Sequence, residues 1–240
     1  MVTESGLAGG ELVRVSVASA VAALTPYAEG DWCGTHARDL DLSCRDTFSH
    51  AVDCLHYYAC LVATARIEPG GTPYELVPRP RTKAEDLVRG LPTYGGMLAA
   101  VVEAADPDSR AYHAYGVSDP AGFAAMGALE VVVHAYDIVA GFGGTWRPPR
   151  DVATAVVDRL FHAEESSLGA FGPADALLWC CGRIPIPGRP RRDESWRWDG
   201  RPAVDRLRPV APAAAPRVRA ATEPAAHPRA PSAAFPSLLP

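Results

Sequence analysis

Residues 123–141 form a largely apolar segment that is long enough for several helical turns and includes Glu130 and His134. Because these two are four residues apart, both project from one face of a helix. A carboxylate next to Leu129 and Val131–Val133 is expected to be buried, and an unpaired buried charge is too costly to keep. Glu130 therefore needs a partner, a proton or a metal ion. The pair is either a buried Glu–His hydrogen bond or two ligands of a metal.

Apolar residues recur at helical spacing along most of the chain, and the alternation typical of strands is almost absent. The predicted helices cover residues 11–25, 43–67, 82–105, 120–141, 150–161 and 174–181. Ser43 with Asp46, and Asp119–Pro120, are typical helix starts. Gly90 and Pro92 are expected to kink or split the third helix. This pattern predicts an all-α fold, a four-helix bundle with a short helical C-terminal extension.

The composition changes near residue 206, after which 19 of 35 residues are Ala or Pro. Such a segment buries too little apolar surface to offset its ordering entropy, so a disordered Ala/Pro-rich tail is predicted. The expected organisation is a metal-binding bundle over 1–165, an extension packed on it over 166–205, and the tail over 206–240.

The formal net charge of −5 argues against a general nucleic-acid-binding protein. The sequence has no leader with a basic start and an apolar core, and no uninterrupted apolar run of about 18 residues, so neither a secretion signal nor a membrane span is expected. None of the six cysteines forms a CxxC pair. We therefore expect a cytoplasmic protein with reduced thiols.

His50, early in the second predicted helix, is the candidate third ligand. Metal sites in helical bundles are built from inward side chains on facing helices. With Glu130 and His134, it completes a set of three protein ligands with an open position, which is typical of a catalytic metal. The same ligands suit zinc, iron or nickel. The alternative is a surface or capping histidine.

Three stretches of the sequence, residues 46–50, 111–137 and 177–190, resemble the DinB-like metal-binding superfamily. Within it, the sequence looks like the N-terminal, metal-binding domain of the mycothiol-dependent maleylpyruvate isomerase family, over roughly residues 10–205. The resemblance implies an up-down-down-up bundle that binds one divalent ion, most often zinc, through the three residues named above. It also implies mycothiol as a co-substrate. The isomerase has a further C-terminal domain, which does not match here.

Two imidazoles and one carboxylate leave a divalent ion with about one positive charge, so a bound water or thiol becomes more acidic. A thiolate formed in this way is a good nucleophile at neutral pH. The expected function is a metal-dependent thiol transferase or isomerase, and its partners are a small-molecule electrophile and a low-molecular-weight thiol. The alternatives are a non-catalytic metal- or small-molecule-binding bundle and a biosynthetic enzyme for a specialised metabolite.

Four other residues are candidates for a role beside the ligands. Asp53 and Asp137, each three residues after a candidate histidine, are expected to accept its second N–H, or else to be exposed. Asp53 is also an alternative ligand to Glu130. His113 is either a catalytic acid/base or substrate contact, or a solvated loop residue. Cys54, one turn after His50, either faces the same cavity or packs as a small apolar side chain.

Residues 182–199 contain five arginines and two tryptophans. One interpretation is a lid whose arginines bind an anionic substrate. The other is a structural wrap, in which the tryptophans pack on the bundle and the arginines are solvated or paired.

Overall fold

The computed structural model describes residues 6–69 and 72–206. Helices are the regular structure of these residues, and the extended pairing within them is limited to three isolated bridges. The all-α prediction is therefore confirmed. The helices are α1 (Gly9–Leu24), the short 3-10 helix η1 (Thr25–Tyr27), α2 (Cys44–Thr64), α3 (Ala84–Ala104), α4 (Pro120–Gly141), α5 (Arg150–Leu160), α6 (His162–Leu168), α7 (Pro173–Cys180) and α8 (Ala203–Arg206).

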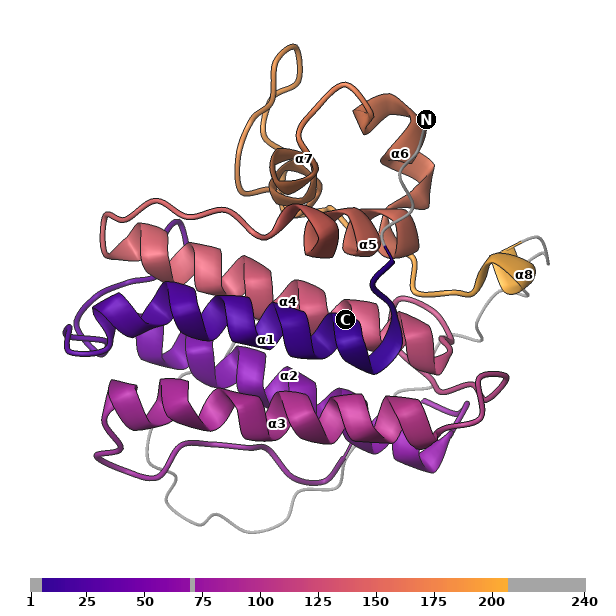
Figure 1. The fold of residues 1–240 in the computed structure, drawn as a ribbon, viewed down its shortest axis with the longest axis horizontal. Coiled ribbons are helices and arrows are strands. Elements are labelled where there is room, and N and C mark those ends of the chain that lie inside the picture. Colours follow the sequence, from indigo (N-terminus) through magenta and orange to yellow (C-terminus); the bar gives the residue numbers. More distant parts are fainter. Residues whose placement is uncertain (1–5, 70–71, 207–240) are drawn as a thin grey trace, which may run out of the picture. The chain divides into compact units, whose positions relative to one another are not determined.

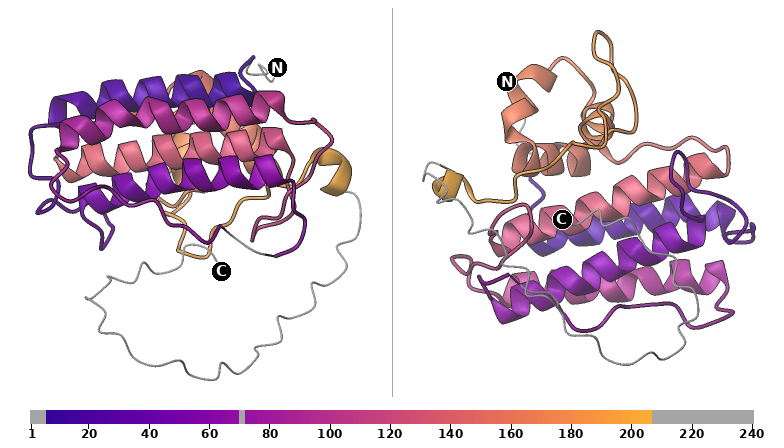
Figure 2. Two further views of the ribbon diagram at one scale, coloured as in Figure 1. Left: turned by 90° about the horizontal axis from the view of Figure 1, so that it is seen from below. Right: turned by 180° about the vertical axis from the view of Figure 1, so that it is seen from behind.

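The four long helices α1 to α4 lie side by side (Figures 1 and 2). Both α1 and α2 pack against α3 and α4, and α5 packs against α4 and α7. Helix α4 is therefore covered by neighbours on several sides, and every residue from Gly122 to Val139 is buried. Helix α4 is long and apolar enough to cross a membrane, but 94% of its most apolar window is buried inside the protein. Its apolar sequence thus matches its place in the core.

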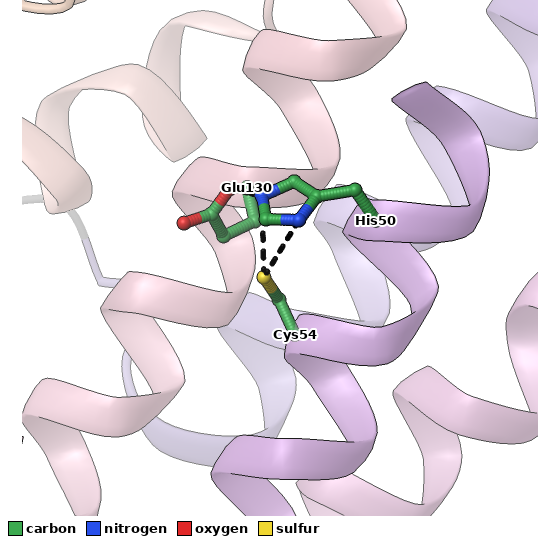
Figure 3. A group of neighbouring side chains, drawn as sticks. All are labelled: His50, Cys54 and Glu130. Atoms are coloured by element: carbon green, nitrogen blue, oxygen red, sulfur yellow. Dashed lines mark hydrogen bonds and ion pairs between the residues drawn. The ribbon is translucent and has the colours of Figure 1, made fainter. Parts of the chain in front are cut away.

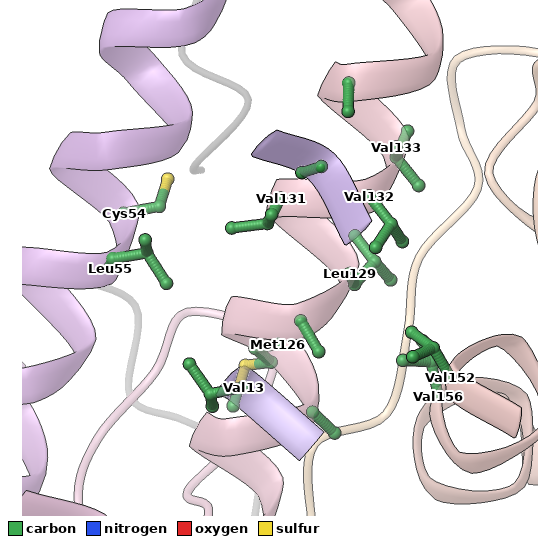
Figure 4. Close-up of a cluster of buried hydrophobic side chains, with 14 of the residues drawn as sticks. Val13, Cys54, Leu55, Met126, Leu129, Val131, Val132, Val133, Val152 and Val156 are labelled. Carbon is green, nitrogen blue, oxygen red and sulfur yellow. The ribbon is translucent and has the colours of Figure 1, made fainter. Parts of the chain in front are cut away.

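The side chains of α4 extend toward different neighbours (Figure 4). They pack in one cluster with residues of α1, α2 and α5, among them Val13, Leu55 and Val152. Gly127 allows a close approach: a Cβ there would lie 2.5 Å from Leu98 Cδ2. The absence of a side chain at this position lets α3 pack directly on α4.

The predicted starts of α2 and α4 are confirmed by their capping hydrogen bonds. The Ser43 hydroxyl accepts from the Asp46 N–H at 3.1 Å, and the Asp119 carboxylate accepts from the Gly122 N–H at 2.7 Å. Of the predicted kink or split of the third helix, the split is wrong, since α3 continues through Pro92, and the kink remains a prediction. Proline removes one backbone hydrogen bond, and packing of α3 on three other helices outweighs this local preference.

The described residues up to Pro202 form one compact unit, and α8 belongs to a second unit that begins at Ala203. The helices α6 and α8 were not predicted from the sequence. From residue 207 onward, the predicted disordered tail lies outside the described residues. The predicted boundaries at residues 165 and 205 remain predictions.

Candidate metal centre

The structure brings together the three predicted metal ligands, one from α2 and two from α4. His50 Nε2 lies 3.8 Å from Glu130 Oε2, and His134 Nε2 lies 3.2 Å from the same oxygen. The two imidazole rings meet edge to face, with centroids 5.2 Å apart. Nitrogen and oxygen ligands of a tetrahedral zinc ion are separated by about 3.3 Å. The two distances to Glu130 Oε2 bracket this value, but His134 is not in the three-donor group that the described residues form around His50 and Glu130.

Cys54 belongs to the same cluster (Figure 3). Its Sγ lies 3.5 Å from His50 Nε2, the nitrogen that also faces Glu130. The donor atoms of His50, Cys54 and Glu130 all lie within 4.8 Å of one another, so these three residues could hold a metal ion. Cys54 is 7% exposed and packs in the hydrophobic core cluster, as the apolar alternative expects, and its thiol also contacts the His50 ring on the side of the site.

His134 is held on its other side by a buried ion-pair chain. Its Nδ1 lies 3.1 Å from Asp137 Oδ2, as predicted. The Arg183 guanidinium, from the segment after α7, donates to both oxygens of Asp137, at 3.0 Å from Nε and 2.8 Å from Nη2. The side chains of Asp137 and Arg183 are only 1% and 11% exposed. The orientation of His134 is therefore fixed by a residue that the sequence analysis did not single out.

This chain shifts the pKa values of its members. Burial alone would lower the pKa of His134. Its contacts with Asp137 and Glu130 outweigh this effect and raise the pKa to about 9. Burial raises the pKa of Glu130, and the hydrogen bond with His134, helped by the charges of His50 and Arg183, more than reverses this shift, so it ends below its usual value. Without an ion, two carboxylates thus face one imidazolium and one guanidinium.

Tyr58 and His113 lie beside the site. The Tyr58 hydroxyl donates to Glu130 Oε1 at 3.3 Å, and the Tyr58 ring contacts that of His113, with centroids 5.8 Å apart. His113 is 2% exposed, so the solvated interpretation is wrong. Its Nδ1 accepts from the Tyr115 backbone N–H at 3.1 Å, which places the proton of a neutral ring on Nε2. That Nε2 is buried without a hydrogen-bond partner in the described part of the chain.

Asp53, the second carboxylate predicted to orient a histidine, has one oxygen engaged elsewhere. Its Oδ1 accepts from the Leu76 backbone N–H at 2.8 Å. This bond ties the connection between α2 and α3 to the surface of α2. A role of Asp53 toward His50 remains a prediction.

The arginine- and tryptophan-rich segment has the features of the structural wrap. Trp198 is buried, and the Trp179 indole N–H donates to the Pro190 carbonyl at 2.9 Å. Arg189 and Arg192 lie over the Trp179 ring. These contacts hold the segment against the helices and so keep Arg183 close to Asp137.

We expect His113 to reduce stability in acid. Burial lowers its pKa to about 4, so the folded protein resists a proton that the unfolded chain binds near pH 6.5. The free energy of unfolding is unaffected by His113 above pH 6.5 and decreases as the pH falls toward 4, because the unfolded chain then binds a proton that the folded chain does not. This amounts to roughly 3 kcal/mol between pH 7.5 and 4. Urea denaturation across this range should show a loss that is smaller by about this amount in His113→Asn, whose amide oxygen can still accept from Tyr115. Equal pH slopes in the two proteins would contradict the assignment.

Comparison with protein-family models, with curated proteins and with solved structures finds no match to this chain. The resemblance to the DinB-like superfamily therefore remains a prediction.

Proposed function

We propose that this protein is a divalent-metal-dependent enzyme, built on a DinB-like four-helix bundle, that reacts a small thiol with an electrophilic small molecule. His50, Glu130 and His134 hold the ion, and the reaction is an S-transfer or an isomerisation in the cytoplasm. The observation that carries the proposal is that both imidazoles reach the same Glu130 oxygen, at 3.8 and 3.2 Å.

The contact between Asp137 and His134 supports this assignment. Histidine ligands generally donate their second N–H to a carboxylate, which orients the ring and strengthens its other nitrogen as a ligand. Here Nδ1 faces Asp137 while Nε2 faces Glu130. Arg183 in turn holds the carboxylate in place with two hydrogen bonds. Without a cation, His134 Nε2 must carry a proton to contact the Glu130 carboxylate favourably. A metal ion bound between the two atoms would take the place of that proton.

The charges of the site favour an anionic co-substrate. Asp137 and Arg183 offset each other, and Glu130 neutralises one of the two charges of a divalent ion. A buried site with one remaining positive charge favours binding of a thiolate or hydroxide. When bound, the ion lowers the pKa of such a thiol or water. His50, whose side chain is 20% exposed, is the member of the site through which solvent has access.

The identities of the ion and the thiol rest on chemistry and on the resemblance. Imidazole and carboxylate donors suit zinc first, with iron or nickel as alternatives. A mycothiol-type thiol is the co-substrate that the resemblance implies. His113, which contacts the Tyr58 ring, is the candidate for moving a proton during the reaction.

A second candidate function is a non-catalytic bundle in which these residues form a structural network. It is favoured by the charge balance without an ion, since the His134 pKa is raised to about 9 and its imidazolium pairs with Glu130. The void that borders His134 is also lined mainly by apolar side chains, such as Leu24 and Phe48, and offers no polar contacts for a substrate beyond His134 itself.

Metal content distinguishes the two functions. We expect untagged protein, purified without chelators, to contain about one zinc, iron or nickel ion per chain by elemental analysis, and His134→Ala and Glu130→Ala to lose it, because each removes a donor from the shared cluster. His56→Ala is the matched control, since His56 lies on the same helix and contacts Cys60 at 3.6 Å. Absence of metal from the wild type, even after reconstitution, would support the structural network instead.

A further inference from the structure

We infer that Cys54 is a fourth protein ligand, so that its sulfur occupies the coordination position that an external thiol must take. This inference rests on the proposed function, because it requires an ion among His50, Glu130 and His134. It adds a regulatory property to that site: the resting centre is closed by the protein's own thiol, and a substrate thiol opens it by exchange.

The geometry at α2 supports this role. Cys54 follows His50 by four residues, so both side chains project from one face of the helix toward α4 (Figure 3). Cys54 Sγ lies 3.5 Å from His50 Nε2 and 4.0 Å from its Nδ1, and the shorter separation is close to the distance of about 3.6 Å between a sulfur and a nitrogen on one tetrahedral zinc ion. The same nitrogen lies 3.8 Å from Glu130 Oε2. Sulfur, nitrogen and oxygen donors therefore converge on one small volume.

Charge balance supports it as well. Glu130 and a Cys54 thiolate together neutralise a divalent ion in a site that is mostly buried. When the site forms, the Cys54 S–H proton leaves to solvent and a sulfur–metal bond replaces a water–metal bond. An incoming thiol RSH exchanges with Cys54: the RS–metal bond forms, the Cys54–metal bond breaks, and Cys54 takes the proton of RSH. No electrons are transferred in either step.

The chain contains an internal comparison. The His56–Cys60 pair repeats the spacing on the same helix, and Cys60 Sγ lies 3.6 Å from His56 Nε2. In the described part of the chain, however, this pair is not part of a three-donor group, whereas His50 and Cys54 are completed by Glu130. A histidine and cysteine at this spacing alone are therefore not expected to bind the ion.

Cobalt(II) substitution tests the inference, because cobalt reports coordination by visible d–d absorption and a thiolate ligand by a near-ultraviolet charge-transfer band. We expect the wild type and Cys60→Ala to show both signals. Cys54→Ala and Cys54→Ser should keep the d–d absorption and lose the charge-transfer band. Addition of 2-mercaptoethanol to Cys54→Ala should restore the band, since the external thiol then takes the vacated position.

The outcomes separate this inference from the proposed function. If d–d absorption appears in the wild type without a sulfur band, or if the band survives in both Cys54 variants, Cys54 is not a ligand and the three-residue site stands alone. If cobalt gives no d–d absorption in any of the proteins, the metal site itself is absent and both proposals fail.

Discussion

Replacing Arg183 with methionine is expected to lower the free energy of unfolding by about 3–5 kcal/mol, the cost of removing one partner from a buried ion pair. Arg183 donates to both oxygens of Asp137, and neither side chain has much access to water. Without the guanidinium, the Asp137 carboxylate keeps only His134 as a charged partner. Urea denaturation with an unchanged m value measures this loss.

Arg147→Met is the matched control for this variant. Arg147 pairs with Asp175 at 2.8 Å, but both side chains are about half exposed. An ion pair of this kind contributes less than about 1 kcal/mol. Combining Arg183→Met with Asp137→Asn should recover part of the loss, because no charge then remains unpaired. If Arg183→Met costs no more than Arg147→Met, the buried pair does not stabilise the fold.

Zinc is expected to raise the free energy of unfolding by about 4 kcal/mol when its free concentration is a thousandfold above the dissociation constant, because it binds the folded chain in preference to the unfolded one. Glu130→Gln should abolish this increase. Its amide would still fill the space beside Tyr58 but would lack the negative charge that pairs with His50 and His134. Thermal denaturation in metal-free buffer, with and without zinc, gives the increase for each protein.

Glu103→Gln controls for the loss of a carboxylate elsewhere. Glu103 forms a half-exposed ion pair with Arg14 at 2.6 Å, on the outer surface of α1 and α3. Zinc should stabilise this variant as much as the wild type. An equal increase in Glu130→Gln would show that zinc binds at a different place.

The helices could be predicted because their signals are local. Ser43 and Asp119 cap the two helices that the sequence assigned to them, and both bonds span only three residues. The positions of the long helices along the chain follow from the spacing of their apolar residues. The continuity of α3 through Pro92 could not be predicted, since it depends on packing against helices that are distant in the sequence.

In the candidate site, too, the contacts within one helix could be predicted, and the contacts between distant segments could not. The proximity of Glu130, His134 and Asp137 follows from spacings of three and four residues on one helix. Arg183 is 46 residues from Asp137, in a segment where five arginines looked alike in the sequence. The burial of His113 likewise depends on Trp198, whose ring lies 5.8 Å away in space but far along the chain. The local spacing of residues does not predict contacts between side chains that are far apart in the sequence.

The distance between Asp137 and Arg183 along the chain also has a consequence for biosynthesis. A ribosome adds about 5–20 residues per second, so the 46 residues between them take about 2 to 9 s to make. During that time α4 has left the ribosome, or is leaving it, with a carboxylate whose guanidinium partner has not been synthesised. The Asp137–Arg183 pair can therefore form only after the segment beyond α7 has emerged, and His134 is held in its final orientation only from that point.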